Sequence, residues 1–99
     1  MGDAVFIATK DLLFRSKLTG VVTTANREVT RDAATCGLAV VDLSAPDWET
    51  TVRELRARSV PVLAFGAHVH ADLLRAARQL GADAVPNSQV ETRLRELLQ

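Results

Sequence analysis

The sequence predicts an α/β domain in which a parallel five-stranded sheet is covered by helices on both faces. Five short segments are continuously apolar or β-branched, which is typical of strands buried on both sides. Segments with a helical spacing of apolar residues separate them, so strands and helices alternate along the chain. Strict alternation with short loops implies parallel strands joined by right-handed crossover helices, and therefore a three-layer sandwich.

The expected elements follow from these patterns. The strands are residues 4–9, 21–25, 38–42, 60–65 and 82–86. The helices are residues 11–18, 28–35, 47–58, 71–80 and 90–99. Apolar residues spaced three or four apart mark the buried side of each helix. In order, these are Leu12 and Leu13; Val29, Ala33 and Ala34; Trp48, Val52 and Leu55; Leu73, Leu74, Ala77 and Leu80; and Val90, Leu94, Leu97 and Leu98.

Helix boundaries and a side-chain pair also have sequence signals. Gly81 follows the fourth helix, where a glycine commonly ends a helix. Ser88 and Glu91 have the spacing of a capping box at the start of the last helix. Glu54 and Arg58 lie four residues apart, the spacing of a helical ion pair.

Composition indicates one domain, residues 1–99, with ordinary polarity. Hydrophobic residues make up 47% and charged residues 24%, with a formal net charge of zero. A neutral chain lacks the positive excess that general binding to nucleic acid or anionic membranes requires, so neither is expected as a partner. Cys36 is the only cysteine, the N-terminus lacks a basic signal-peptide region, and the apolar runs are too short to span a bilayer. We therefore expect a cytoplasmic protein.

The parallel sheet predicts where a site would lie. Chemistry in open parallel sheets sits beyond the carboxyl ends of the strands, where the strand order reverses. The flavodoxin-like order 2-1-3-4-5 puts that crevice between the first and third strands. Asp42 lies at its centre, at the end of an apolar run. The other expected crevice residues are Thr9, Lys10, Asn26, Gly66 and Asn87.

Three stretches give the chain a family resemblance. They are "VVDLSAP" at residues 40–46, "VPVLAFGAH" at 60–68 and "LLRAARQLGADAVPNS" at 73–88. Over nearly its whole length the chain resembles a response-regulator receiver domain, the CheY-like (βα)5 module of bacterial two-component signalling. The resemblance implies that Asp42 corresponds to the phosphoacceptor, with Pro46 matching the proline usually found four residues later.

The chain departs from the receiver pattern where the phosphorylation chemistry is carried out. Thr9 and Lys10 stand where receivers have an acidic pair that holds Mg²⁺. Gly66 replaces a Ser or Thr, and Asn87 replaces a Lys. Because Mg²⁺ requires oxygen ligands and phosphoryl transfer requires charge neutralisation, Asp42 alone is a poor site. We therefore expect an atypical, stand-alone receiver-like module that is not an enzyme and has no metal or cofactor.

Several alternatives remain open from the sequence. Asp42 either pairs with Lys10 or caps the turn that follows it. The rival functions are a phosphoacceptor receiver that uses Asp42, and a sensor whose crevice holds a small ligand. The resemblance implies a protein partner or a second copy bound on the face formed by residues 71–80, 82–86 and 90–99.

Two further patterns have ordinary interpretations. His68 and His70 straddle a loop and a helix start, so a metal site there would need a third ligand such as Asp72 or Asp42. Cys36 lacks the arginine that a phosphatase loop would place after it, which favours a packed thiol.

Overall fold

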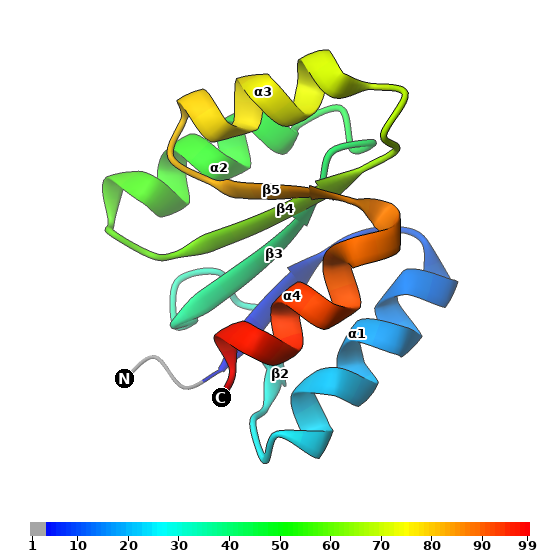
Figure 1. Ribbon diagram of the computed structural model, residues 1–99. Coiled ribbons are helices and arrows are strands. Elements are labelled where there is room, and N and C mark those ends of the chain that lie inside the picture. The colour runs from blue at the N-terminus through cyan, green and yellow to red at the C-terminus, as the bar shows by residue number, and fades with distance from the viewer. Residues whose placement is uncertain (1–3) are drawn as a thin grey trace.

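A computed structural model of the protein describes residues 4–99 and contains a five-stranded sheet (Figure 1). The strands are β1 (Val5–Ala8), β2 (Val29–Thr30), β3 (Leu38–Asp42), β4 (Val62–Gly66) and β5 (Asp83–Pro86). Their order is β2-β1-β3-β4-β5, and every neighbouring pair is parallel. The predicted α/β fold class and the 2-1-3-4-5 strand order are confirmed.

Helices cover both faces of this sheet. They are α1 (Leu12–Thr24), α2 (Trp48–Ala57), α3 (Ala71–Gln79) and α4 (Val90–Leu97), with a 3₁₀ helix, η1 (Asn87–Gln89), before α4. Figure 1 shows α1 and α4 on one face and α2 and α3 on the other. Residues 4–99 therefore contain four α-helices, one fewer than the sequence predicts.

The predicted strand at residues 21–25 is wrong, because α1 continues through it to Thr24. Val21 and Val22 are buried together with Leu18, and this spacing of three and four residues places all three on one side of a helix. Helical packing against the sheet thus overrides the strand preference of a β-branched run. Thr23 is accommodated because its hydroxyl donates to the carbonyl of Thr19.

The predicted helix at residues 28–35 is also wrong. This segment holds the two-residue strand β2 and then a loop that leads into β3. The amide of Asp32 donates to Thr30 Oγ1, and Asp32 Oδ1 accepts from the amide of Ala34. Such local side-chain bonds compete with the helical backbone pattern.

Arg58 ties this loop to α2. Its Nη1 donates to the carbonyl of Ala34 at 3.1 Å, and its Nη2 donates to the carbonyl of Ala33 at 2.5 Å. The predicted Glu54–Arg58 pair is therefore wrong, and the observed i,i+4 pair on α2 joins Arg53 to Glu49.

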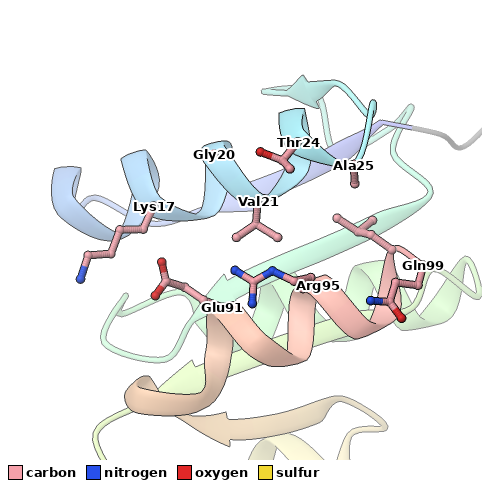
Figure 2. A pocket seen from close by; sticks show the side chains of 9 residues that line it. Lys17, Gly20, Val21, Thr24, Ala25, Glu91, Arg95 and Gln99 are labelled. Atoms are coloured by element: carbon pink, nitrogen blue, oxygen red, sulfur yellow. The ribbon is translucent and has the colours of Figure 1, made fainter.

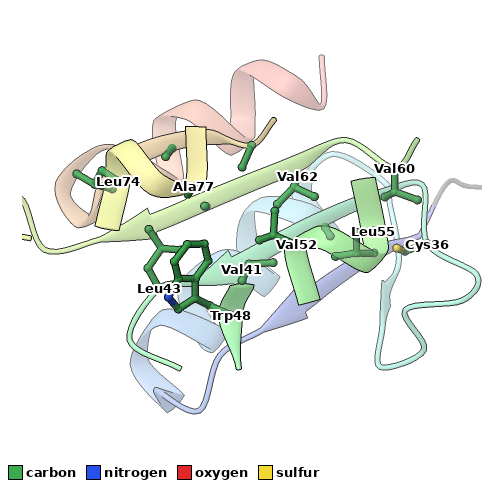
Figure 3. Packing of buried hydrophobic residues seen from close by; sticks show 14 residues of the cluster. Cys36, Val41, Leu43, Trp48, Val52, Leu55, Val60, Val62, Leu74 and Ala77 are labelled. Carbon is green, nitrogen blue, oxygen red and sulfur yellow. The ribbon is translucent and has the colours of Figure 1, made fainter. Parts of the chain in front are cut away.

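Two buried clusters flank the sheet. Val5, Ile7, Val40, Leu63 and Phe65 pack against α1 and α4. On the opposite face, β3, β4 and β5 pack against α2 and α3, with Trp48, Val52, Leu55, Leu74 and Ala77 buried there as predicted (Figure 3). Val90, Leu94 and Leu98 are buried as predicted, but Leu12, Leu13 and Leu97 are exposed.

The helix ends agree only in part with the sequence signals. Gly81 adopts φ +95 after α3, the left-handed conformation that glycine tolerates, as predicted. The capping box at Ser88 and Glu91 does not form, because η1 precedes α4 and Gln89 takes the N-cap position without a side-chain bond. Within residues 4–99, no helix is long and apolar enough to cross a membrane.

Candidate functional site

Asp42 is the last residue of β3, and its side chain is held at the carboxyl edge of the sheet. It is only 7% exposed. Thr9 Oγ1 donates to Asp42 Oδ2 at 2.7 Å. Ser44 donates to Asp42 Oδ1 twice, from its amide at 2.9 Å and from its hydroxyl at 2.7 Å. Both oxygens of this buried carboxylate are therefore hydrogen-bonded within the protein, as burial of a charge requires.

The network extends from Thr9 into α1. Thr9 Oγ1 accepts from the amide of Asp11 at 3.1 Å. Asp11 Oδ1 in turn accepts from the amides of Leu13 and Phe14, which makes Asp11 the N-cap of α1. The loop after β1, the start of α1 and the turn after β3 are thus linked through one hydroxyl.

The two expectations for Asp42 have different outcomes. Its bond to the amide of Ser44 caps the turn after β3, as one alternative anticipated. The predicted pair with Lys10 is not present, since none of the ion pairs found in residues 4–99 includes Lys10. The Thr9 hydroxyl, just after β1, is the group that reaches Asp42 from this side, and Lys10 is exposed.

A cavity of about 530 Å³ opens beside Asp42. Gly66, the last residue of β4, and Asn87, which follows β5 and begins η1, both line it. Its other lining residues are Asp11, Phe14, Leu43, Ser44, Phe65, Ala67, His70 and Leu73. The lining contains two carboxylates and neither Lys nor Arg, so His70 is the one basic side chain that an anionic ligand would meet there.

Asn26 and Lys10 lie elsewhere. Asn26 follows α1 with φ 60, and its amide donates to the carbonyl of Thr23. Because residues 21–24 are helical, Asn26 precedes β2, and its placement in the crevice at the carboxyl ends is wrong. Lys10 lines a different, smaller cavity beside Trp48, which Thr9 also borders.

The donors beside Asp42 do not fit the Mg²⁺ that receivers use. Two hydroxyls and an amide already donate to the Asp42 carboxylate. A ligand must instead offer a lone pair to the cation, which the amide of Ser44 cannot do, and the hydroxyls of Thr9 and Ser44 carry no negative charge to bind it tightly. Asp11 Oδ1 caps α1 by accepting from the amides of Leu13 and Phe14. No cluster of three His, Cys, Asp or Glu side chains suited to a metal occurs in residues 4–99.

The sequence placed Thr9 in the crevice but did not single out Ser44 or the bond between Thr9 and Asp42. Ser44 supplies two of the three bonds to Asp42, and Thr9 makes its contact across 33 residues of sequence. The Asp-x-Ser spacing, which is that of a side-chain-capped turn, was the available signal for Ser44. His70 lines the cavity and His68 is exposed.

Cys36 is a packed thiol, as its sequence context indicates. It is 7% exposed, and its Sγ donates to the carbonyl of Ala33 at 3.3 Å. Burial raises the pKa of the thiol above its ordinary value of 9.0, and the nearby Arg58 guanidinium opposes that shift. The neutral thiol is a weak nucleophile, so this position lacks the character of a catalytic cysteine.

A second groove lies between α1 and α4 and is separate from Asp42. It measures about 580 Å³ and includes Lys17, Gly20, Glu91 and Arg95 (Figure 2). A Cβ atom added at Gly20 would meet no heavy atom within 4 Å, so the missing side chain contributes to the groove. Lys17 and Arg95 are exposed and Glu91 is half-buried, which makes this a solvated surface between two helices.

Comparison with solved structures identifies the class of fold. The receiver domain of the response regulator AraT from Geobacillus stearothermophilus is similar over 99% of this chain and 91% of its own, with a TM-score of 0.77 and 20% identity. A response regulator from Thermotoga maritima is similar over 99% and 95%, with a TM-score of 0.76 and 16% identity. The chain therefore has the CheY-like fold of response-regulator receiver domains.

Larger proteins also contain this fold. NtrX from Brucella abortus, solved in complex with ADP, matches 98% of this chain with a TM-score of 0.77 and 17% identity. This chain spans only 25% of that protein. No protein-family model and no curated protein sequence matches the chain.

Proposed function

We propose that this protein is a receiver-like signalling module that acts through protein contacts, without catalysis and without Mg²⁺-dependent phosphorylation of Asp42. The main support is the set of bonds to the buried Asp42 carboxylate, whose two oxygens accept hydrogen bonds from the neutral donors of Thr9 and Ser44. These donors hold the carboxylate in place but bring no positive charge. Phosphoryl transfer depends on such charge, which a metal or a lysine normally supplies.

The residues at two other positions that receivers use for phosphorylation also support this role. Gly66 offers no hydroxyl beside Asp42, and Asn87 offers an amide in place of an ammonium group. The proposed role places the protein in the cytoplasm, where Cys36 stays reduced. The module is proposed to comprise residues 1–99 as a single domain.

Binding of beryllofluoride, which mimics an acyl phosphate, tests the proposal. The wild-type protein is expected to show no change in its ¹H–¹⁵N spectrum with Mg²⁺ and beryllofluoride. Asp42→Asn serves as the control without an acceptor. The double variant Thr9→Asp, Lys10→Asp restores the acidic pair and is expected to bind Mg²⁺ more tightly than the wild type. Beryllofluoride binding by the wild type that is lost in Asp42→Asn would support the phosphoacceptor alternative instead.

The proposed partner surface is the face formed by α3, β5 and α4. Asp83 on β5 and Arg93 on α4 form an ion pair of 2.6 Å, and Arg93 also reaches Glu96 at 3.0 Å. Leu97 is exposed on the same helix. The proposed contact would bury Leu97 inside a polar rim made by Asp83, Arg93 and Glu96.

Light scattering tests whether the occupant is a second copy. A doubled mass that returns to that of a monomer in Leu97→Asp, but not in the control Val69→Asp, supports a homodimer on this face. A dimer unaffected by Leu97→Asp places the contact elsewhere. A monomer at high concentration leaves a different protein as the proposed partner.

A further inference from the structure

The outer side of β1 is only half paired. Val5 and Phe6 pair with β2, whereas all four residues of β1 pair with β3 on the other side. β2 ends at Thr30. There Thr30 Oγ1 accepts a hydrogen bond from the amide of Asp32, and the chain turns away from β1. The carboxyl half of β1 therefore has a strand neighbour on one side only.

Arg15 of α1 takes the place of the missing strand. Its Nη2 donates to the carbonyl of Ile7 at 3.1 Å and to the carbonyl of Thr9 at 2.7 Å. The amide of Val5 donates toward β2, to the carbonyl of Glu28. Because alternate residues of a strand direct their backbone groups to the same side, the carbonyls of Ile7 and Thr9 also face this open side. They are the acceptors that an added strand would use.

The surroundings of this edge are apolar and positively charged. A cavity of about 290 Å³ is lined by Phe6, Ile7, Ala8, Arg15 and Arg31, and no acid is among them. Phe6 and Ala8 are only half-buried, although they contact the cluster beneath α2 and α3. Arg31 is exposed.

We propose that the open side of β1, from Ile7 to Thr9, binds an extended segment of a partner protein in which apolar and acidic residues alternate. The segment's amides would replace the Arg15 guanidinium at the two carbonyls, as in strand addition to a sheet edge. Side chains of neighbouring strands that point to the same face contact each other. Apolar residues would thus cover Phe6 and Ala8, and acidic residues would face Arg15 on the other side of the sheet.

The positive charges of Arg15 and Arg31 favour an acidic partner segment over a basic one. Arg15, once released from the backbone carbonyls, can form a bidentate pair with a carboxylate. Arg31 adds a second positive charge at the same cavity. A basic segment would instead meet two like charges at the position where it must dock.

A blocked peptide of alternating valine and glutamate tests the proposal on the protein of residues 1–99. Millimolar peptide is expected to shift the amide resonances of Ile7, Ala8 and Thr9 in ¹H–¹⁵N spectra. A matched peptide of valine and lysine is expected to shift none of them. Arg31→Glu is expected to weaken binding of the acidic peptide at least tenfold, while Arg75→Glu, an exposed arginine on α3, leaves it unchanged.

The competing explanation is that Arg15 merely protects the edge from pairing, a common role for charged side chains at sheet edges. Absence of shifts at Ile7 to Thr9, equal binding of the lysine peptide, or equal effects of the two arginine variants would each overturn the proposal. Unchanged circular dichroism of both variants serves to show that they are folded.

Discussion

The two faces of the sheet differ most at β1. On the face covered by α1 and α4, Val5 is 0% exposed and Ile7 is 2% exposed. On the opposite face, Phe6 and Ala8 are half-buried, because a loop replaces the helix expected between β2 and β3. α2 and α3 contact β3, β4 and β5, so their cover does not extend fully over β1. The loss of one crossover helix therefore opens one face locally and leaves the other closed.

The largest expected effect is on stability, and it differs between substitutions on the two faces of β1. Ile7→Ala should lower the free energy of unfolding by about 2–5 kcal/mol, because it leaves a cavity in a closed core. Phe6→Ala removes a larger side chain but should cost only about 1–2 kcal/mol, because that ring is already partly hydrated. Urea denaturation of both variants measures the difference. A loss for Phe6→Ala equal to that for Ile7→Ala would show that the second face is closed as well.

The end of β1 offers a sharper test at the site itself. Thr9→Val keeps the shape of the side chain but removes the hydroxyl that donates to Asp42 Oδ2. The expected loss in unfolding free energy is about 1–3 kcal/mol, because a buried carboxylate oxygen is left without its donor. Thr9→Ser should recover most of it. Equal stability of Thr9→Val and the wild type would mean that water replaces the hydroxyl and that the bond from Thr9 does not hold the Asp42 side chain in place.

The loop that replaces the missing helix should open when its tether is removed. Arg58→Ala deletes the donors to Ala33 and Ala34 and should expose Cys36. The rate of reaction of Cys36 with a disulfide reagent is expected to rise several-fold. Arg53→Ala, which removes only the exposed pair with Glu49, is the matched control and should leave the rate unchanged. Equal rates in the two variants would contradict the tether.

The raised pKa of Cys36 adds a pH dependence with a definite sign. Its thiolate is disfavoured in the folded protein by burial. The stabilisation is fully present below the unfolded pKa, near the ordinary value of 9.0, and is lost as the pH rises through the folded pKa. Stability measured by urea should therefore fall more steeply above that pH in the wild type than in Cys36→Ala. Parallel curves would refute this assignment.

The smallest expected change in stability is at Gly20, in the middle of α1, one of the two helices that cover the Val5 and Ile7 face of the sheet. Gly20→Ala should raise the free energy of unfolding by about 0.5–1 kcal/mol, because alanine favours the helix and the added Cβ meets no atom within 4 Å. Thermal denaturation measures the gain. A loss of stability would mean that the groove between α1 and α4 is occupied in solution.

Prediction from sequence succeeded where pattern and packing agree. β3 and α2 to β5 follow continuous apolar runs and clear helical stripes, and their positions were predicted to within one or two residues. The second strand was misplaced because Val21 and Val22 satisfy both strand preference and helical spacing. β2 has only two residues, too few to produce a pattern.

The site shows the same division. Asp42, Gly66 and Asn87 could be placed because the strand order fixes which strand ends lie together. The hydrogen bonds of Thr9 and Ser44 could not be predicted, since they depend on side-chain directions across separate loops. Asn26 was placed wrongly only because it depended on the misplaced strand.

Intact-mass spectrometry after incubation with acetyl phosphate and Mg²⁺ shows whether Asp42 accepts a phosphoryl group. Acetyl phosphate donates a phosphoryl group without a partner kinase, so the result depends only on the acceptor site. The mass of the wild type is expected to stay unchanged on incubation, as is that of Asp42→Asn. A gain of one phosphoryl group in the wild type that is absent from Asp42→Asn would contradict this expectation.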